Sequence, residues 1–379
     1  MKTLTPLPVV VAFLVCILSA QPTGARTWYI LPDGTGDAST VQAGIDSAAV
    51  GDIVEVVCGT YYEYDIVMKS GITLRSETGL ADCVTIDAQG LGRVFYCEDV
   101  ENTTSIEGFT VTNGNGSMFS GGGMYCENSS PSISHCNFIG NVVAGLGGGG
   151  GGMCCRDSSS PTLTHCNFSD NVADVVFGGG GGMYCNNSSP TLTHCSFFNN
   201  SVPHSAAGDE AGGGGLYFSS YSSPTLTYCM FSGNYSAYSG GGIHCGQYYN
   251  NNSPLNLISC TISGNNAGGP GGGIYCTPHP THALTNSTIT GNSGFRGGGI
   301  FVNGDLFAFN TDIQDNSATQ SGSDGYVLNV STALLTCCDV DLGQWFVEEG
   351  GTLILDNEGC GVAVEAKTWG DVKALYRSR

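Results

Sequence analysis

Histidine and cysteine recur side by side along the chain. His135, His165 and His194 each stand directly before a cysteine, at the same place in three similar stretches. Imidazole and thiolate are ligands that Zn²⁺ prefers, but each cysteine must point to the opposite side of the strand from its histidine. In later stretches the equivalent position is occupied by Tyr228, Ser259 and Asn286 instead of histidine. Such variation is typical of a residue at a bend. We therefore predict no metal site and no cofactor.

Acidic side chains are abundant but lack a catalytic or calcium-binding pattern. Asp339 and Asp341 do not have the spacing of a calcium loop, so the sequence leaves Ca²⁺ binding open without supporting it. The only cations between residues 120 and 330 are Arg156 and Arg296. Arg156 stands one repeat after Glu127 at the same repeat position, which predicts a solvated ion pair rather than a catalytic group.

Composition excludes one class of partner. The 379 residues include 32 Asp and Glu against 11 Lys and Arg, for a net charge of -21. Such a chain repels phosphate backbones and anionic membrane surfaces, and no basic run offsets the charge. We predict no nucleic-acid partner.

The first residues have the features of an export signal. Lys2 precedes an apolar run over 7–18, and small residues follow it. No later apolar run is long enough to span a bilayer. We predict a signal peptide at 1–26 and a chain that is secreted or held at the cell surface, without a membrane span.

A repeat of about 29 residues organises the rest of the chain. Each repeat has a glycine run, an apolar residue, often a cysteine, then Ser-Pro, and ends with an aromatic residue or Ile three positions before Asn. From Asn141 to Asn316 there are six such steps. Apolar residues alternate with polar ones, and the units lack helical spacing. The sequence predicts an all-β chain, a right-handed parallel β-helix of roughly ten coils with three strands in each.

The repeat also predicts which side chains form the core. Like residues should stack on like, because successive coils are expected about 4.8 Å apart. We expect a column of Asn at a tight bend with left-handed backbone, each amide bonding to the next. Most of the cysteines should be reduced, since in-register parallel strands aim their Cβ atoms the same way. Two pairs near the ends are better placed to form disulfides, Cys58 with Cys83 and Cys338 with Cys360.

One segment carries a resemblance to a known family. The stretch ASTVQAGIDSAAVGDIVEVVCGTYYE, residues 38–63, resembles the entry segment of the pectate-lyase-like β-helix superfamily. The glycine-run and F-x-x-N repeats are similar to those of polymorphic outer-membrane proteins, although this sequence shows no region like their membrane barrel. Together these likenesses cover residues 38–320 and imply a short helix that caps the first coil. They predict a strand and capping helix at 27–50, a β-helix at 51–360 and a tail at 361–379.

The family includes enzymes, and the resemblance implies what their residues would be. Pectate lyases need carboxylates that hold Ca²⁺ and a cation beside the uronate, which only Arg156 or Arg296 could supply within the repeats. Polygalacturonases use clustered Asp residues, and the NTD at residues 310–312 matches one of their short motifs. No Asp-Asp pair or Gly-His-Gly follows it. We therefore predict no catalytic residue.

An aromatic column is the feature most suited to binding. It occupies the position between the two inward residues of the first strand of each repeat, so we expect it to face outward. Aromatic faces near acidic and amide groups suit sugar rings, although the rings could instead stack on one another to stabilise the sheet. The predicted ligand-binding residues are Tyr125, Tyr184, Tyr217, His244, Tyr275 and Phe301.

These features lead to a function at the level of class. We predict an exported, non-catalytic β-helix protein that binds polysaccharide or a cell-surface glycan, or acts as an adhesive module. A polysaccharide lyase or glycoside hydrolase that acts on uronate-containing glycans is the alternative. A structural scaffold is the third possibility.

Overall fold

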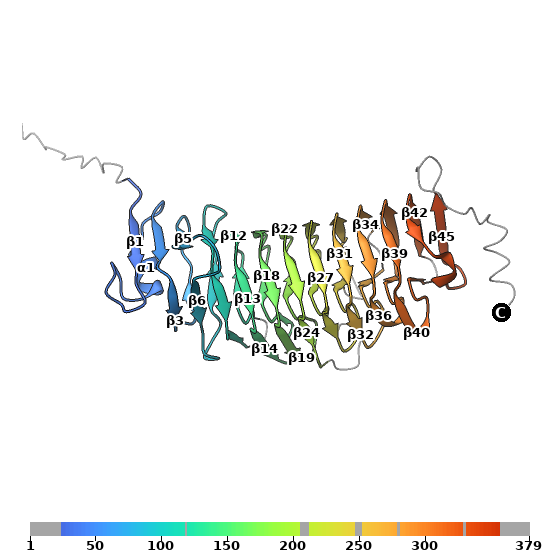
Figure 1. The fold of residues 1–379 in the computed structure, drawn as a ribbon, viewed down its shortest axis with the longest axis horizontal. Helices are drawn as coiled ribbons and strands as arrows, with labels where there is room; N and C mark the ends of the chain where they lie inside the picture. The colour runs from blue at the N-terminus through green and yellow to red at the C-terminus, as the bar shows by residue number, and fades with distance from the viewer. Residues whose placement is uncertain are drawn as a thin grey trace, which may run out of the picture.

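The chain coils into a long solenoid of short parallel strands (Figure 1). The computed structural model describes residues 24–117, 120–204, 212–246, 252–278, 281–328 and 331–356. The predicted signal peptide and C-terminal tail therefore fall almost wholly outside the described residues. The predicted parallel β-helix is confirmed, and two of its sheets have eleven strands, close to the ten coils expected.

Three sheets form the walls of the cylinder. The first, sheet A, contains β1 (Thr27–Ile30), β2 (Ile53–Val56), β5 (Thr73–Ser76), β8 (Ser105–Glu107), β12 (Ser132–Ser134), β17 (Thr162–Thr164), β22 (Thr191–Thr193), β26 (Thr225–Thr227), β30 (Asn256–Ile258), β34 (Thr281–Thr285), β38 (Asp305–Phe309), β42 (Thr332–Thr336) and β45 (Thr352–Asp356). Sheet B contains β3 (Gly59–Tyr61), β6 (Val84–Asp87), β9 (Thr110–Thr112), β13 (Asn137–Ile139), β18 (Asn167–Ser169), β23 (Ser196–Phe198), β27 (Met230–Ser232), β31 (Thr261–Ser263), β35 (Thr288–Thr290), β39 (Asp312–Gln314) and β43 (Asp339–Val340).

Sheet C carries the aromatic column. It contains β4 (Ile66–Val67), β7 (Phe95–Glu98), β11 (Met124–Glu127), β16 (Met153–Arg156), β21 (Met183–Asn186), β25 (Leu216–Ser219), β29 (Ile243–Cys245), β33 (Ile274–Cys276), β37 (Ile300–Val302), β41 (Gly325–Val327) and β44 (Trp345–Val347). A 3-10 turn, η1 (Leu342–Gln344), precedes its last strand.

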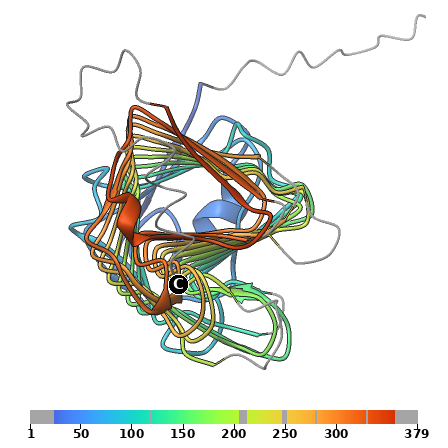
Figure 2. The same cartoon turned by 90° about the vertical axis from the view of Figure 1, so that its right-hand side faces the viewer.

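A fourth sheet was not expected from the sequence. Sheet D forms where the repeats vary in length, and it makes a lobe on one side of the cylinder (Figure 2). It contains β10 (Asn115–Gly116), β14 (Val142–Gly145), β19 (Val172–Val175), β24 (Ser201–Val202), β28 (Tyr235–Ser236), β32 (Asn266–Ala267), β36 (Ser293–Arg296) and β40 (Ser317–Ser321). A glycine pair, β15 (Gly149–Gly150) with β20 (Gly179–Gly180), adds a small fifth sheet.

The N-terminal end of the cylinder is covered by one helix, α1 (Val41–Ser47). Thr40 caps it, because its hydroxyl accepts a hydrogen bond from Ala43 N at 3.0 Å. The buried face of α1 packs against the first strands, where a Cβ on Gly44 would lie 2.6 Å from the Ile30 side chain. A helix at the position predicted for the cap is thus confirmed.

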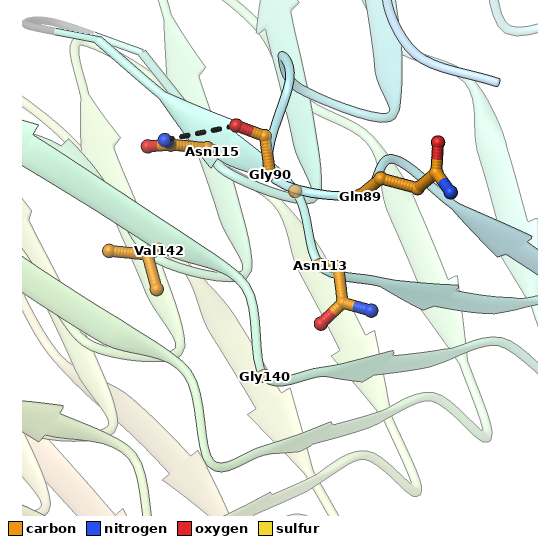
Figure 3. Close-up of a pocket in the computed structure, with 7 residues that line it drawn as sticks. Gln89, Gly90, Asn113, Asn115, Gly140 and Val142 are labelled. Atoms are coloured by element: carbon orange, nitrogen blue, oxygen red, sulfur yellow. Dashed lines mark hydrogen bonds between the residues drawn. The ribbon is translucent and has the colours of Figure 1, made fainter. Parts of the chain in front are cut away.

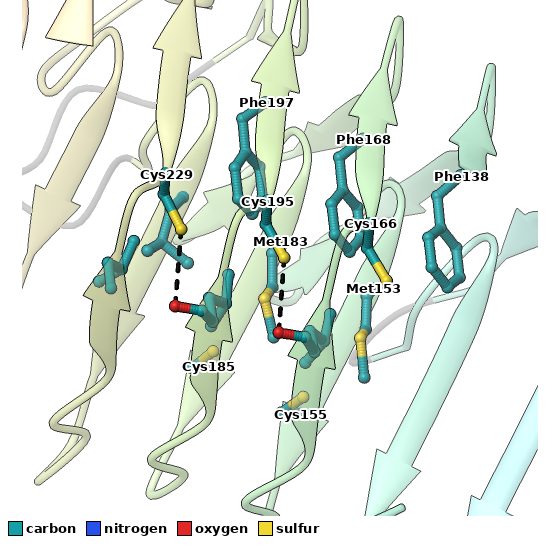
Figure 4. Packing of buried hydrophobic residues seen from close by; sticks show 14 of the residues in the cluster. Phe138, Met153, Cys155, Cys166, Phe168, Met183, Cys185, Cys195, Phe197 and Cys229 are labelled. Carbon is teal, nitrogen blue, oxygen red and sulfur yellow. Dashed lines mark hydrogen bonds between the residues drawn. The ribbon is translucent and has the colours of Figure 1, made fainter. Parts of the chain in front are cut away.

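Like side chains stack on like inside the cylinder (Figure 4). The rings of Phe138, Phe168 and Phe197 lie parallel, with centroids 4.7 Å apart at each step. Beside them runs an inward column of thiols, in which Cys126, Cys155 and Cys185 are register partners. The in-register hydrogen bonds between coils place equivalent residues on top of one another, as the repeat predicted.

The asparagine column forms a continuous hydrogen-bonded ladder. In each coil the Asn side chain donates to the Oδ1 atom of the next Asn, from Asn141 through to Asn316. The ladder ends on Asp324, which accepts from the backbone and the side chain of Asn316 at 3.0 Å. Burial raises the pKa of the Asp324 carboxyl. The prediction of left-handed backbone at the Asn itself was wrong, because the residue before it takes that conformation, as at Gly140 and Asp170.

The cysteines follow the predicted pattern except at one end. Cys58 and Cys83 form a disulfide, with Cα atoms 4.8 Å apart, and thirteen other cysteines are free and buried. The predicted bridge from Cys338 is wrong: Cys338 faces the core as a free thiol, while the preceding Cys337 is disulfide-bonded. Alternation along the chain explains the correction, since only one of two neighbours can face the core. Cys360 lies outside the described residues.

The Asn ladder should contribute strongly to stability. Replacing Asn200 by Ala removes the side-chain donor that bonds to Phe168 O at 2.8 Å and to Asn234 Oδ1 at 3.0 Å. It also leaves the buried donors of Asn171 without their acceptor, so we expect a cost of about 3 kcal/mol or more. The midpoint of urea unfolding should fall clearly for Asn200→Ala. The exposed Asn266→Ala is the control, and equal midpoints for the two variants would contradict a structural role for the ladder.

Candidate functional site

The predicted ligand-binding residues do form one column on the outer side of sheet C. Their strands pair in register, with Cys154 between Tyr125 and Tyr184. From Tyr184 to Phe301 the rings contact one another from coil to coil. Tyr184 and Tyr217 have ring centroids 5.4 Å apart, and the Tyr275 and Phe301 rings are stacked at 5.2 Å. Sequence reasoning therefore placed these six side chains correctly relative to one another.

Their exposure was predicted wrongly. All six predicted side chains are at most 9% exposed: Tyr125, Tyr184, Tyr217, His244, Tyr275 and Phe301. His244 is fully enclosed, and its ring nitrogens lie 2.9 Å from Ser239 Oγ and 3.0 Å from Gly246 O. The rings face away from the cylinder but are covered from outside. Whether any of them contacts a ligand stays a prediction.

The glycine runs and the sheet D lobe provide the cover. A Cβ on Gly148 would lie 3.1 Å from the Tyr184 hydroxyl, and one on Gly150 only 1.8 Å from Met153 O. The glycines are therefore required for the close approach of this backbone to sheet C. Behind them, Val143, Ala173, Val175 and Val202 form a small apolar cluster inside the lobe. The alternative interpretation of the column, rings that stack to stabilise the sheet, fits this arrangement.

The column is open to solvent at its N-terminal end. Tyr96, on β7, stacks on Tyr125 with a centroid distance of 5.8 Å and is only partly buried. The Arg93 guanidinium lies 5.1 Å from the Tyr96 ring centroid and 5.3 Å from that of Tyr125. Each phenol donates to a carboxylate, Tyr96 to Glu98 at 2.8 Å and Tyr125 to Glu127 at 3.2 Å. Two rings, two acidic groups and a guanidinium thus meet at one edge, which we call the open end.

The electrostatics of the open end favour hydrogen bonding over proton transfer by the phenols. Burial, together with the hydrogen bond to Glu98, raises the pKa of Tyr96 to about 12. Burial and the nearby Cys154 raise the pKa of Tyr125 as well. Both phenols are therefore protonated at neutral pH and act as donors rather than bases. Arg93 is held by an ion pair with Asp65, at 3.1 Å.

Sequence reasoning missed Tyr96, Glu98 and Arg93. Residues 94–98 read VFYCE, close to the GMYCE at 123–127, but no glycine run precedes them. A search for the glycine run therefore skips this coil, whereas the YCE triplet could have identified it. Glu127 and Arg156 are register partners as expected, and the Arg156 guanidinium lies 5.9 Å from the Tyr184 ring centroid. The solvated ion pair between them stays a prediction.

A surface pocket of about 420 Å³ lies close to the open end along the chain (Figure 3). Its lining is almost entirely amide and backbone, from Gln89, Gly90, Asn113, Gly114, Asn115, Gly140 and Val142. Asn115 fixes one wall, because its side chain donates to Gly90 O at 3.2 Å and its backbone N to Gly92 O at 2.7 Å. The segment 89–98 therefore contributes to both the pocket and the open end.

The other sequence candidates have different surroundings. His135, His165 and His194 stack with centroids 5.2 and 4.9 Å apart, so their rings lie parallel and do not converge on one point. Among the described residues, the group able to hold a metal is a different one, Cys245, Cys276 and His282. Burial lowers the pKa of His282 to about 4.

Asp312, from the NTD motif, lies on sheet B as the register partner of Asp339. Burial raises the pKa of the Asp312 carboxyl, and the nearby carboxylates of Asp339 and Asp315 act in the same direction. Gln314 donates to Asp312 Oδ2 at 3.1 Å, while Oδ1 is buried without a hydrogen-bond partner among the described residues. Two carboxylates in adjacent coils are thus present, although the sequence pattern did not predict a catalytic pair.

The fold and the stacked columns define the chain as a parallel β-solenoid. A family model described as a right handed beta helix region matches residues 65–318. The chain belongs to this family of right-handed β-helix proteins. No curated protein matches it. Among the described residues, no helix is long and apolar enough to cross a membrane.

Solved structures with a similar course of the chain include polysaccharide-active enzymes. The pectate lyase Pel9A is 14% identical, with 90% of this chain and 82% of that chain covered and a TM-score of 0.44. A mannuronic acid specific family 6 polysaccharide lyase from human gut microbiota is 12% identical, with coverages of 90% and 89% and a TM-score of 0.46. The A-module of the mannuronan C-5 epimerase AlgE4 from Azotobacter vinelandii is 12% identical, with coverages of 87% and 100% and a TM-score of 0.42.

The burial of the column predicts a large difference between two of its tyrosines. Tyr217 is fully buried, so Tyr217→Ala should lower the free energy of unfolding by about 3–5 kcal/mol through the cavity it leaves. Tyr96 is partly exposed, and Tyr96→Ala should cost about 1 kcal/mol or less. Urea unfolding followed by circular dichroism measures both. If Tyr217→Ala kept the wild-type stability, the ring would be accessible and the covered column would be wrong.

Proposed function

We propose that the protein is an exported, non-catalytic β-helix that binds polysaccharide at the open end of sheet C. The observation that carries the proposal is the set of groups around the partly exposed Tyr96: the stacked Tyr125, the carboxylates of Glu98 and Glu127, and the Arg93 guanidinium. The rings between Tyr125 and Tyr326 are covered, and at the other end of the described column Phe346, which stacks on Tyr326, is 38% exposed. Of the six predicted ligand-binding residues, the proposal therefore keeps Tyr125, and it adds the neighbouring Tyr96.

Sugars match the chemistry of this edge. A pyranose ring offers C–H groups to an aromatic face and hydroxyls to carboxylates and guanidinium groups. The acceptors at the open end are carboxylates that already bond to phenols, so a sugar hydroxyl can share them without leaving a buried group unpaired. The net charge of -21 repels polyanions, which favours a neutral polysaccharide over a uronate-rich one.

Two features support binding without chemistry at this edge. The phenols hold their protons at neutral pH, so neither can abstract a proton from a sugar. Arg93 is paired with Asp65 and lies against the rings, which suits a positioning group. For export, the support is the apolar run at 7–18 and the Cys58–Cys83 disulfide, which persists in oxidising compartments.

A glycoside hydrolase is the second candidate function, favoured by Asp312 and Asp339. General acid catalysis needs a carboxyl that stays protonated beside one that is ionised, and burial raises the pKa of Asp312. The two residues are register partners in adjacent coils of sheet B. This pair lies on a different sheet from the open end, so the two functions can be tested separately.

Affinity electrophoresis against a panel of neutral and uronate-containing polysaccharides tests the binding proposal. The wild-type chain should be retarded by at least one neutral polysaccharide. Loss of one ring contact is worth about 1 kcal/mol, so Tyr96→Ala should weaken retention about fivefold. Tyr228→Ala, which removes an exposed ring on another part of the surface, should leave retention unchanged.

Reducing-sugar and unsaturated-uronate assays on the same panel separate binding from catalysis. Retention with no product supports the binding proposal, whereas product release that disappears in Asp312→Asn supports the hydrolase. Absence of retention by every polysaccharide would contradict the proposal. Equal retention of Tyr96→Ala and wild type would place binding away from the open end.

A further inference from the structure

One histidine breaks the apolar pattern inside the cylinder. His282, on β34, is fully buried, and its register partner in the next coil is Leu306, followed by Ala333 and Leu353. An imidazole at an aliphatic position costs free energy unless its nitrogens find good partners. Leu255 N donates to Nδ1 at 3.2 Å, and Nε2 lies 3.4 Å from Thr277 O. The Nδ1 contact has an ordinary length, whereas the 3.4 Å contact of Nε2 is long for a hydrogen bond.

Two thiols lie beside this imidazole. Cys245 on β29 and Cys276 on β33 are register partners in adjacent coils of sheet C, with Sγ atoms 3.7 Å apart. One imidazole nitrogen and the two Sγ atoms all lie within 4.8 Å of one another. Other coils of the thiol column, such as those of Cys155 and Cys185, form no such group with a histidine in the described residues.

We propose that Cys245, Cys276 and His282 bind a zinc ion inside the solenoid. Zn–S bonds of about 2.3 Å at tetrahedral angles place two sulfur atoms about 3.8 Å apart, close to the observed 3.7 Å. The thiols are therefore already at the separation that a shared tetrahedral ion requires. Imidazole is the third ligand type that Zn²⁺ prefers, and the nitrogen that binds the ion must give up its present contact with the backbone.

Charge favours a divalent ion at this place. Binding Zn²⁺ releases the two thiol protons to solvent, and the two thiolates then balance the charge of the ion, so the buried group is neutral. A monovalent ion such as Cu⁺ would leave one net negative charge in an apolar core, which is costly.

The position gives the ion a structural role. It would join the coil of Cys245 to the following coil, which supplies both Cys276 and His282. All three side chains are buried, so the ion must enter while the coils assemble. We therefore expect slow exchange with external chelators in the native state and rapid loss on unfolding.

Metal analysis of the full chain tests the proposal. The chain is refolded with Zn²⁺ under reducing conditions and dialysed against EDTA, and zinc is then measured by mass spectrometry. About one equivalent per chain is expected. Refolding with Co²⁺ instead should give thiolate-to-cobalt charge-transfer absorption and the visible bands of tetrahedral cobalt.

Three variants locate the ion. His282→Leu restores the aliphatic column and should fold, but should lose the zinc and the tetrahedral cobalt spectrum. Cys276→Ala should do the same, whereas Cys185→Ala, in another coil of the same thiol column, should keep both. A wild-type chain that refolds with strand-type dichroism but holds no zinc would overturn the proposal. So would a His282→Leu variant with unchanged zinc content and cobalt spectrum.

Discussion

The parallel hydrogen bonds between successive coils are the constraint on which the rest of this structure depends. They fix each residue directly above its equivalent in the next coil, so a side chain repeated in the sequence becomes a column in space. Phenylalanine rings stack in such a column, and buried asparagines satisfy one another's hydrogen-bonding groups. Each coil therefore depends mainly on its two neighbours for stability, as in other solenoids.

The same constraint decides where ligands can reach the surface. Aromatic residues on the outer side of sheet C stack on one another, so most of their faces are already in contact. The sheet D lobe covers the middle of the column, and rings and charged groups are found together near solvent at the open end around Tyr96. A second such group lies at the C-terminal end, where the exposed Phe346 stacks on Tyr326 beside Arg296. His282 is a residue that differs in type from the aliphatic residues above it in its column, and this difference indicates a specific local role.

Much of the fold follows from the repeat in the sequence. The core columns, the amide ladder and the Cys58–Cys83 bridge depend on local alternation or on repeat spacing, which a single sequence displays. The capping helix was expected instead from the family resemblance of residues 38–63. The cover over Tyr184 and Tyr217 could not be predicted from the repeat, because sheet D is built from segments that vary in length and composition between repeats. Only the close approach of backbone at Gly148 and Gly150 explains why the glycine runs are there. The open end was not predicted from the sequence, because its coil lacks the glycine run that marks the other repeats.

Removal of one coil tests the central claim most directly. Deletion of residues 153–182 joins Gly152 to Met183, which is the register partner of Met153, so every column continues across the junction. The shortened chain should fold with strand-type dichroism, and its longest dimension in small-angle X-ray scattering should fall by about 5 Å. Deletion of 168–182 removes half a coil, misaligns all the columns and should prevent folding. If the full-coil deletion unfolded the chain, or if the half-coil deletion were tolerated equally well, register between coils would not be what holds the structure together.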